Sequence, residues 1–445
     1  MRKTRIISKR FLFDAVAALL LSTALPISSQ QTQPIVSRAI TMSEAVNIAL
    51  KNNPTLQARQ AMVTAAAARV RMAKAMIRPQ ITATSYATGS SMPMIVPGPE
   101  VVGGPQAWTL TPDTERLNGI LMGMYPLYTG GKLRAQIESA HSSNEAAAAD
   151  LAVSELDVSL AAKITYYQVL LAREMVNVYE DRVAEAQERL RIAEKAFEEG
   201  RIARYDLLRN RTDLAESQQQ LNNARRDVEV ALADLKSALG ISQESNITLK
   251  DALATPQPLE DVTILRQLAV RQRPEVTAAH ARIKAARSGV GVAKSAYKPQ
   301  IYAMGMAELA ASSESTDTGA LVGITVSIPI LDGGLRKSAV DEAQTMVQQA
   351  EAEKREVLLA VERDVSTAYA RVGAAAENVT LAKAAVEQAE EDYRIIKLRY
   401  EAGKSINVEV LDALASLTRA RTDYVAALYN YNVARADLLR AIGQR

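Results

Sequence analysis

The sequence predicts a mainly α-helical chain with a small β portion, built from one structural unit that occurs twice. Three observations predict this fold: two halves that match at fixed spacing, four short segments that alternate apolar and smaller or polar residues, and two very long stretches almost free of helix-breaking residues. A repeat has to be recognised before a fold is assigned, because each copy must form an equivalent structure.

The two halves keep their register over long distances. Matching residues are separated by 220 positions in the first part of each half and by 203 positions after it. The pairs that carry this spacing include Pro54 and Pro274, Pro79 and Pro299, Pro126 and Pro329, Gly200 and Gly403, and Gly240 and Gly443. A longer loop in the first half absorbs the difference. We therefore divide the chain into a first repeat, residues 30–250, and a second repeat, residues 251–445.

Residues 1–29 are predicted to be an export signal. Basic residues open the chain, and a short apolar run from Phe11 to Leu25 follows. That run falls short of the roughly 20 apolar residues that a spanning helix needs, so we expect a cleaved signal peptide rather than a membrane anchor.

Composition excludes several classes of function. The net charge is +3 with acidic and basic residues interleaved, so we expect no nucleic-acid partner. The chain has no cysteine, which excludes disulfides, thiolate metal sites and lipid attachment through cysteine. Its two histidines lie in separate helical segments, and no motif typical of an enzyme is present. We expect no catalytic site, no cofactor and no metal site.

Each half is predicted to contain a helix pair, a strand pair and a long helical hairpin. Thr41 and Glu44 have the spacing of a capping box at the first helix start. Alternation predicts strands at about 80–88 and 117–128 in the first repeat and at about 300–309 and 321–331 in the second. The Gly- and Pro-rich segment from Gly89 to Asp113 is predicted to be an exposed loop.

The long helices give the strongest local signal. Residues 132–199 contain neither proline nor glycine, and residues 335–402 contain only Gly373. Returning helices are predicted at 201–239 and 404–442. Apolar residues recur at steps of three and four along these segments, which is the spacing of coiled coils.

The strands raise a physical problem. Each half supplies two strands, and a four-stranded sheet with open edges cannot sit in lipid, because its edge N–H and C=O groups have no partners there. Either the strands lie in water, or several chains pool them. Three chains would supply twelve strands, enough for a closed barrel with a lumen.

Several segments in order resemble the TolC family of outer-membrane efflux proteins. They are Ala49 to Leu56, the Pro-Gln strand starts, Tyr125-Pro126-Leu127 and Ile328-Pro329-Ile330 before Gly-Gly, and Tyr400 to Gly403 followed by Glu409 to Asp412. The resemblance covers about residues 41–443. It implies a homotrimer in which a twelve-stranded barrel in outer-membrane lipid continues into a periplasmic α-helical barrel. It also implies two protein partners, a periplasmic adaptor (membrane fusion) protein and an inner-membrane pump of the RND, ABC or MFS type, in efflux or type I secretion.

The resemblance places function at the turns of the two hairpins. It implies that these turns form the periplasmic end, which meets the adaptor. The contact candidates are Gly200, Arg201, Arg204, Tyr205, Gly403, Lys404 and Ser405. The alternative is that the glycines only form the turns, since glycine tolerates the positive φ common after a helix; the two roles are compatible.

Glu409 and Asp412 are candidates for an acidic ring at the entrance. They are three residues apart and share one helix face, so three copies would bring six carboxylates to a narrow opening that favours cations. In the family, acidic residues at these positions line the constriction. The alternative is a solvated helix start that the helix dipole favours.

Asp206 and Tyr400 are candidates for a lock that closes the entrance. The resemblance suggests a hydrogen bond from the Tyr400 hydroxyl to Asp206. Ser405 stands where the family pattern has a basic residue, so we expect either a weaker lock or one that uses Lys404 or Arg204 instead. Alternatively, Tyr400 only fills the coiled-coil seam. A rival to the channel as a whole is a soluble periplasmic coiled-coil scaffold or adaptor protein.

Overall fold

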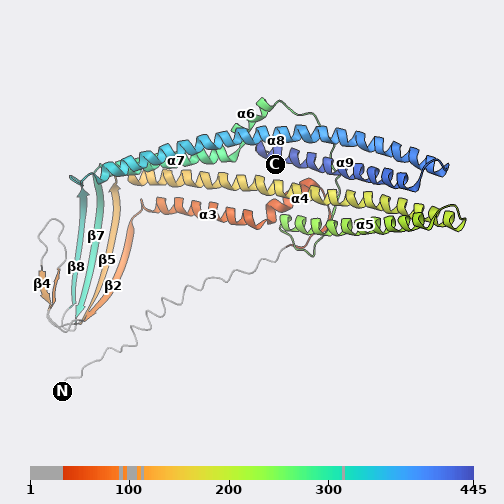
Figure 1. Cartoon of the computed structure of the whole chain (residues 1–445). Coiled ribbons are helices and arrows are strands. Elements are labelled where there is room, and N and C mark those ends of the chain that lie inside the picture. Colours follow the sequence, from red (N-terminus) through yellow and green to blue (C-terminus); the bar gives the residue numbers. More distant parts are fainter. Residues whose placement is uncertain (1–33, 90–93, 98–107, 112–114, 313–315) are drawn as a thin grey trace, which may run out of the picture.

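The structure is a computed structural model that describes residues 34–89, 94–97, 108–111, 115–312 and 316–445. The molecule is elongated, with a β-sheet at one end and helices that run from it to two hairpin tips at the other end (Figure 1). The predicted export signal, residues 1–29, lies outside the described residues. Over the described ranges, no helix is both long enough and apolar enough to cross a membrane.

Local chemistry explains the helix starts of the first repeat. Thr41 and Glu44 form a complete capping box at α2. Pro54 is the first residue of α3, where a missing N–H costs no helical hydrogen bond. The elements are β1 (Ser37–Ile40), α2 (Met42–Asn52), α3 (Pro54–Ala75), β2 (Gln80–Gly89), β3 (Met94–Pro97), β4 (Trp108–Thr111), β5 (Glu115–Tyr128), α4 (Lys132–Glu198), α5 (Arg204–Leu239) and β6 (Asn246–Leu249).

The second repeat has the same order of helices and long strands. Pro274 opens its second helix, as Pro54 does in the first repeat. The elements are α6 (Val262–Gln272), α7 (Pro274–Ser295), β7 (Gln300–Ser312), β8 (Thr316–Ser327), α8 (Leu335–Glu401) and α9 (Asn407–Ala441). The long helices α4 and α8 have 67 residues each, so each extends about 100 Å at ~1.5 Å per residue.

One antiparallel sheet holds the four long strands in the order β2-β5-β7-β8. Its register repeats the spacing of the sequence. Gln80 faces Met124 in the first strand pair, and Gln300 faces Ser327 in the second. These residues are related by the same separations, 220 and 203, that relate the two halves of the sequence. The duplication therefore extends to the hydrogen-bond register of the sheet.

The strand predictions need three corrections. The fourth long strand spans Thr316–Ser327, not 321–331; Pro329 lacks the N–H that would extend the ladder, and its carbonyl accepts from Arg336 at 2.7 Å. Short strands β1 and β6 form a parallel pair that the sequence analysis did not include. The hairpin of β3 and β4 lies inside the segment predicted to be a loop.

The return helices begin later than predicted. α5 starts at Arg204, not at 201, and α9 starts at Asn407, not at 404. In each case the residue before the helix, Ala203 or Ile406, is extended, so the chain needs a short turn before it can run back.

Two buried clusters lie midway along the molecule, one in each repeat. Tyr166 is fully buried in the first, and Tyr431 is fully buried in the second. The segment that joins the repeats crosses between these clusters: Tyr166 donates to Asp251 at 2.9 Å, and Tyr431 accepts from the Gln257 N–H at 2.8 Å. A third, smaller cluster, which includes Val410 and Leu414, lies near the tip of the second hairpin. The clusters fix the helices that carry the tips.

Candidate functional site

Glycines in the left-handed backbone conformation form the turns at both tips. Gly200 has φ 69° and Gly403 has φ 72°. After the first, the Arg201 N–H reaches back to the Ala196 carbonyl at 2.8 Å, which satisfies a carbonyl at the helix end. An added Cβ at either glycine would meet no atom within 4 Å. Glycine is therefore required here by backbone conformation rather than by lack of space.

The structure leaves most of the predicted adaptor-contact residues open to solvent. Gly200, Arg201, Arg204 and Tyr205 are exposed on the first tip, with Tyr205 64% exposed. On the second tip, Gly403 and Lys404 are exposed and Ser405 is half-buried. Glu199, which pairs with Arg201, and Glu401 are also exposed, so the two tips present an accessible surface with charges of both signs.

Glu409 and Asp412 lie on the exposed face of α9, in its first two turns. The opposite face buries Val410 and Leu414 inside the hairpin, which fixes the direction of the two carboxylates. Ser405 donates a hydrogen bond to Glu409. It therefore supports the acidic residue instead of supplying the positive charge that the family pattern has at its position.

Asp412 also lines a groove between α5 and α9 with a cavity volume of about 760 Å³. Tyr205 and Arg209 line the groove from α5, and the Arg209 guanidinium donates to the Tyr205 hydroxyl at 3.0 Å. Helix α4 also lines the groove, through Arg182. Arg182 and the nearby Arg189 both form ion pairs with Asp213 of α5. Burial lowers the pKa of Arg189 despite the Asp213 carboxylate.

The structure brings Asp206 and Tyr400 near each other without a hydrogen bond between them. Both side chains are half-buried. Burial raises the pKa of Tyr400, and the Asp206 carboxylate adds to this shift. The two residues therefore interact electrostatically in this conformation.

A hydrogen bond that the sequence analysis missed joins the two hairpins further from the tip. The hydroxyl of Tyr393 on α8 donates to Glu185 on α4 at 2.7 Å. Lys397 lies 3.7 Å from the same carboxylate, and its ammonium is 5.8 Å from the centre of the Tyr393 ring. Burial, and then the Glu185 carboxylate, raise the pKa of Tyr393, so the hydroxyl remains a donor at neutral pH.

Arg421 of α9 makes a second connection between the hairpins. Its guanidinium contacts Glu390 of α8 at 2.8 Å and Asp181 of α4 at 3.4 Å. The repeat offers a signal for the first connection: Tyr393 stands where the first repeat has Leu190. A hydroxyl that replaces an apolar residue in a coiled-coil seam indicates a polar partner across that seam.

In the described part of the chain, no cluster of three or more His, Asp or Glu residues is arranged to hold a metal ion. The features at the tips are instead charged surfaces and links between helices. Such features suit a passage or a docking surface.

Comparison with known proteins identifies the family. The model of the outer membrane efflux protein family matches residues 45–241 and 265–444, segments that fall within the two repeats. Protein CyaE of Bordetella pertussis is 27% identical over 414 residues, which cover 90% of this chain and 81% of that protein. The cobalt-zinc-cadmium resistance protein CzcC of Cupriavidus metallidurans is 26% identical over 357 residues, which cover 77% and 82%.

The fold matches solved outer-membrane channels. The CmeC channel of Campylobacter jejuni superposes with a TM-score of 0.74 at 19% identity, over 90% of this chain and 85% of that one. The family match favours the channel over the soluble scaffold as an account of the chain. With two matched segments that span both repeats, this chain belongs to the outer membrane efflux protein family.

Proposed function

We propose that three copies of this chain form one closed channel through the outer membrane, which receives cargo at the helical tips from a periplasmic adaptor and an inner-membrane pump. The observation that carries this proposal is the sheet. In one chain it has four strands, and its outer strands β2 and β8 each lack a neighbour on one side among the described strands. Unpaired edges are unstable in lipid, so further strands must cover them.

The sheet has the two faces that a barrel in lipid requires. Register places Ile81, Leu121, Ala307 and Ile324 on one face, which is mostly apolar over the middle of the strands. Thr82, Glu308 and Thr325 belong to the other face. The long strands have 10 to 14 residues, which matches the roughly 9–11 residues that cross a bilayer at a tilt.

The repeat specifies how the edges of two copies meet. Within one chain, Gly123 of β5 pairs with Gly305 of β7. The counterpart of Gly123 is Val326 of β8, and the counterpart of Gly305 is Ser85 of β2. Pairing of β8 with β2 of the next copy in this register would continue the sheet without a break.

Cross-linking tests the closure directly. Because the chain has no cysteine, Ser85→Cys and Val326→Cys supply its only thiols. Oxidation in outer membranes should link separate copies into products the size of two and three chains. In the control variant, Ser85→Cys with Val322→Cys, the two cysteines are out of register across the expected strand pair, so its products should keep the size of one chain. Purified trimers should also conduct ions in planar bilayers. Single-chain products, or a protein that leaves the membrane in buffer, would contradict the proposal.

The tips support the proposed partners. The exposed residues of the two turns form an accessible charged surface at the end opposite the sheet (Figure 1), where an adaptor reaching from the inner membrane would dock. We assign Glu409 and Asp412 to an acidic ring at the entrance, and Tyr400 with Asp206 to its lock. Charge reversal at Arg201 and Arg204 should weaken binding of the purified adaptor and leave conductance unchanged.

A further inference from the structure

Helix α3 has an exposed face although the matching face of α7 is covered. α7 packs between α8 and α4, whereas α3 has α4 as its only long neighbour in the described chain. The exposed residues on α3 are Ala58, Ala61 and Ala65; their counterparts Ala278 and Ala281 are buried and Ala285 is half-buried. Something outside one chain is therefore needed to cover α3 as α4 covers α7.

Helix α8 has the complementary exposed face. Its exposed residues are Ser338, Glu342, Thr345, Gln349 and Ala352, at alternating steps of four and three. Their counterparts on α4 are Ala135, Ser139, Ser142, Ala146 and Ala149, all buried or half-buried. On α4 this face meets α7: the Ser139 hydroxyl donates to the Ala285 carbonyl at 3.4 Å, and a Cβ added at Gly291 would lie 3.2 Å from that of Ala135.

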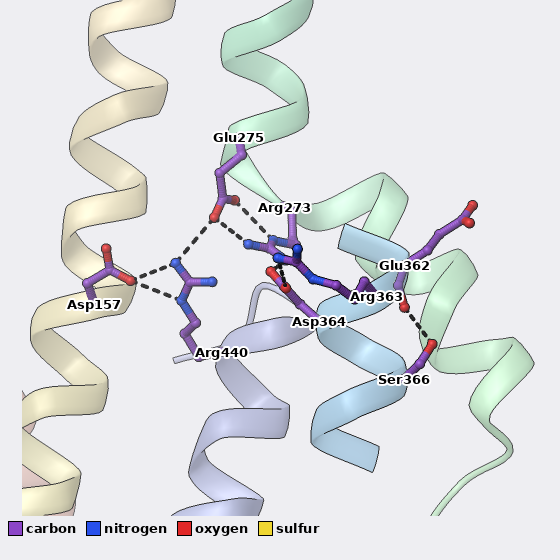
Figure 2. Close-up of polar contacts among 8 residues, drawn as sticks. All are labelled: Asp157, Arg273, Glu275, Glu362, Arg363, Asp364, Ser366 and Arg440. Atoms are coloured by element: carbon purple, nitrogen blue, oxygen red, sulfur yellow. Dashed lines mark hydrogen bonds and ion pairs between the residues drawn. The ribbon is translucent and has the colours of Figure 1, made fainter. Parts of the chain in front are cut away.

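Inside one chain, a network of charges clamps the two repeats together. Arg440 of α9 lies between Asp157 of α4 and Glu275 of α7, at 2.8 and 3.4 Å (Figure 2). Arg273, buried at the start of α7, donates to Glu275 at 2.7 Å and to Asp364 of α8 at 3.1 Å. The network joins four helices from both repeats.

The residues at the matching positions of the other repeat carry no charge. The counterparts of Arg273, Glu275, Asp364, Arg440 and Asp157 are Asn53, Thr55, Ala161, Ser237 and Ala360. Besides the contacts of Glu185 and Asp181 near the tips, α4 forms further ion pairs with the second repeat through Arg282 with Asp150, Lys284 with Glu145, and Arg445 with Glu155. Their counterparts are Met62 with Glu353, Thr64 with Gln348, and Ser242 with Leu358. None of these can form an ion pair.

We propose that the ionic clamp inside each chain has no equivalent at the seam between copies, where α3 of one copy lies on α8 of the next as α7 lies on α4. The inference rests on the proposed ring of copies and specifies its helical interface. Transfer of the internal contacts places Arg71 opposite Ser338 and Ala65 opposite Glu342. Glu342 is about one helical turn from Ser338, within reach of the long Arg71 side chain, so one new ion pair is expected near the sheet. Around the level of Ser237 and Ala360 the seam is uncharged.

The alignment of the seam is tested by Arg71→Cys with Ser338→Cys. These positions match Gly291 and Ala135, whose Cβ separation is close to the ~3.5–4.5 Å of a disulfide. Oxidation should join different copies. The control, Gly291→Cys with Ala135→Cys, should close a bridge within one chain and leave its mass in denaturing gels that of a single chain. Conducting channels without the link between copies would overturn this inference alone. Linked copies without conductance would overturn the proposed channel and leave the seam standing.

The missing clamp is tested by adding it. Ser237→Arg with Ala360→Asp copies the Arg440–Asp157 pair into the seam between copies. The double variant should raise the temperature at which the trimer dissociates in detergent, whereas Ser237→Arg alone should not. Two results would show that the transferred alignment of the seam is wrong at this level. One is an equal rise in dissociation temperature for the single variant. The other is no rise for the double variant although the disulfide of Arg71→Cys with Ser338→Cys forms between copies.

Discussion

The hydroxyl of Tyr393 on α8 and the carboxylate of Glu185 on α4 form a 2.7 Å hydrogen bond that joins the two hairpins of one chain. The bond lies seven residues, about two helical turns, from Tyr400. Tyr393 is 7% exposed, so water competes little for its hydroxyl. The contact therefore resists separation of the hairpins near the entrance.

Tyr393→Phe should loosen this connection. The change removes one buried hydrogen bond and leaves Glu185 with Lys397 as its partner, at 3.7 Å. We expect a loss of about 1 kcal/mol in the free energy of unfolding and a higher single-channel conductance. Thermal unfolding and planar-bilayer recordings measure the two effects. Tyr429→Phe is the control. Burial alone raises the pKa of Tyr429, with no contribution from a hydrogen bond or a nearby charge, so its hydroxyl holds no helices together. Equal effects of the two substitutions would contradict the role assigned to Tyr393.

Tyr400→Phe should change conductance less than Tyr393→Phe. Tyr400 lies near Asp206 without a hydrogen bond to it, so its hydroxyl contributes less to holding the hairpins together. Recordings of both variants under one salt condition give the comparison. A larger increase for Tyr400→Phe would place the main lock at Asp206 instead of Glu185.

Acid should weaken the clamp of Figure 2 through Glu275. Burial would raise the pKa of Glu275, but the hydrogen bonds from Arg273 and the nearby positive charges outweigh it and lower the pKa. A carboxyl whose pKa is lowered by folding stabilises the fold above its ordinary pKa of 4.5 and loses this contribution as pH falls through the lower, folded value.

The measurement for this effect is the difference in melting temperature between the wild type and Glu275→Gln. It should be largest near neutral pH and shrink below about pH 4.5. The control is Glu356→Gln, an exposed residue of α8 with no ion pair among the described residues, which should show no such pH dependence. A difference that is constant with pH would remove Glu275 from the clamp.

Local features of the sequence predict much of the fold. The absence of proline and glycine predicts α4 and α8, and the Pro-Gln pairs predict where β2 and β7 begin, because these signals lie within the elements themselves. Pairing at long range is different. β1 meets β6 through partners such as Ser37 and Asn246, more than 200 residues apart, and four-residue strands carry too little pattern to reveal it.

The candidate site shows the same division. Gly200 and Gly403 mark the tips by their residue type, and the alternating faces of α9 predict that Glu409 is exposed. The Tyr393–Glu185 bond depends on how one hairpin is rotated against the other, which periodicity within a helix does not specify. The clamp around Arg273 could be found only by asking where the two repeats differ, because the first repeat has Asn53 at the position equivalent to Arg273.

Gly403→Ala should destabilise the second tip. Its φ of 72° is in the left-handed region, which costs an L-residue about 1–2 kcal/mol, while the added methyl group has free space. The matched control is Gly373→Ala inside α8, where alanine should stabilise the helix by about 0.5–1 kcal/mol and also meets no neighbour. Thermal unfolding should shift in opposite directions for the two variants, and a shared direction would contradict the backbone argument.

Glu409→Ala with Asp412→Ala should reduce the cation selectivity of the channel. Both carboxylates lie on the exposed face of α9, and in a trimer six of them would surround the entrance, where carboxylates attract cations and repel anions. Reversal potentials across a salt gradient in planar bilayers measure the selectivity. Ser416→Ala changes the same face without altering charge, so it should leave the reversal potential at the wild-type value. If the double variant keeps the wild-type potential while still conducting, these carboxylates do not line the entrance, and their role is confined to the start of α9.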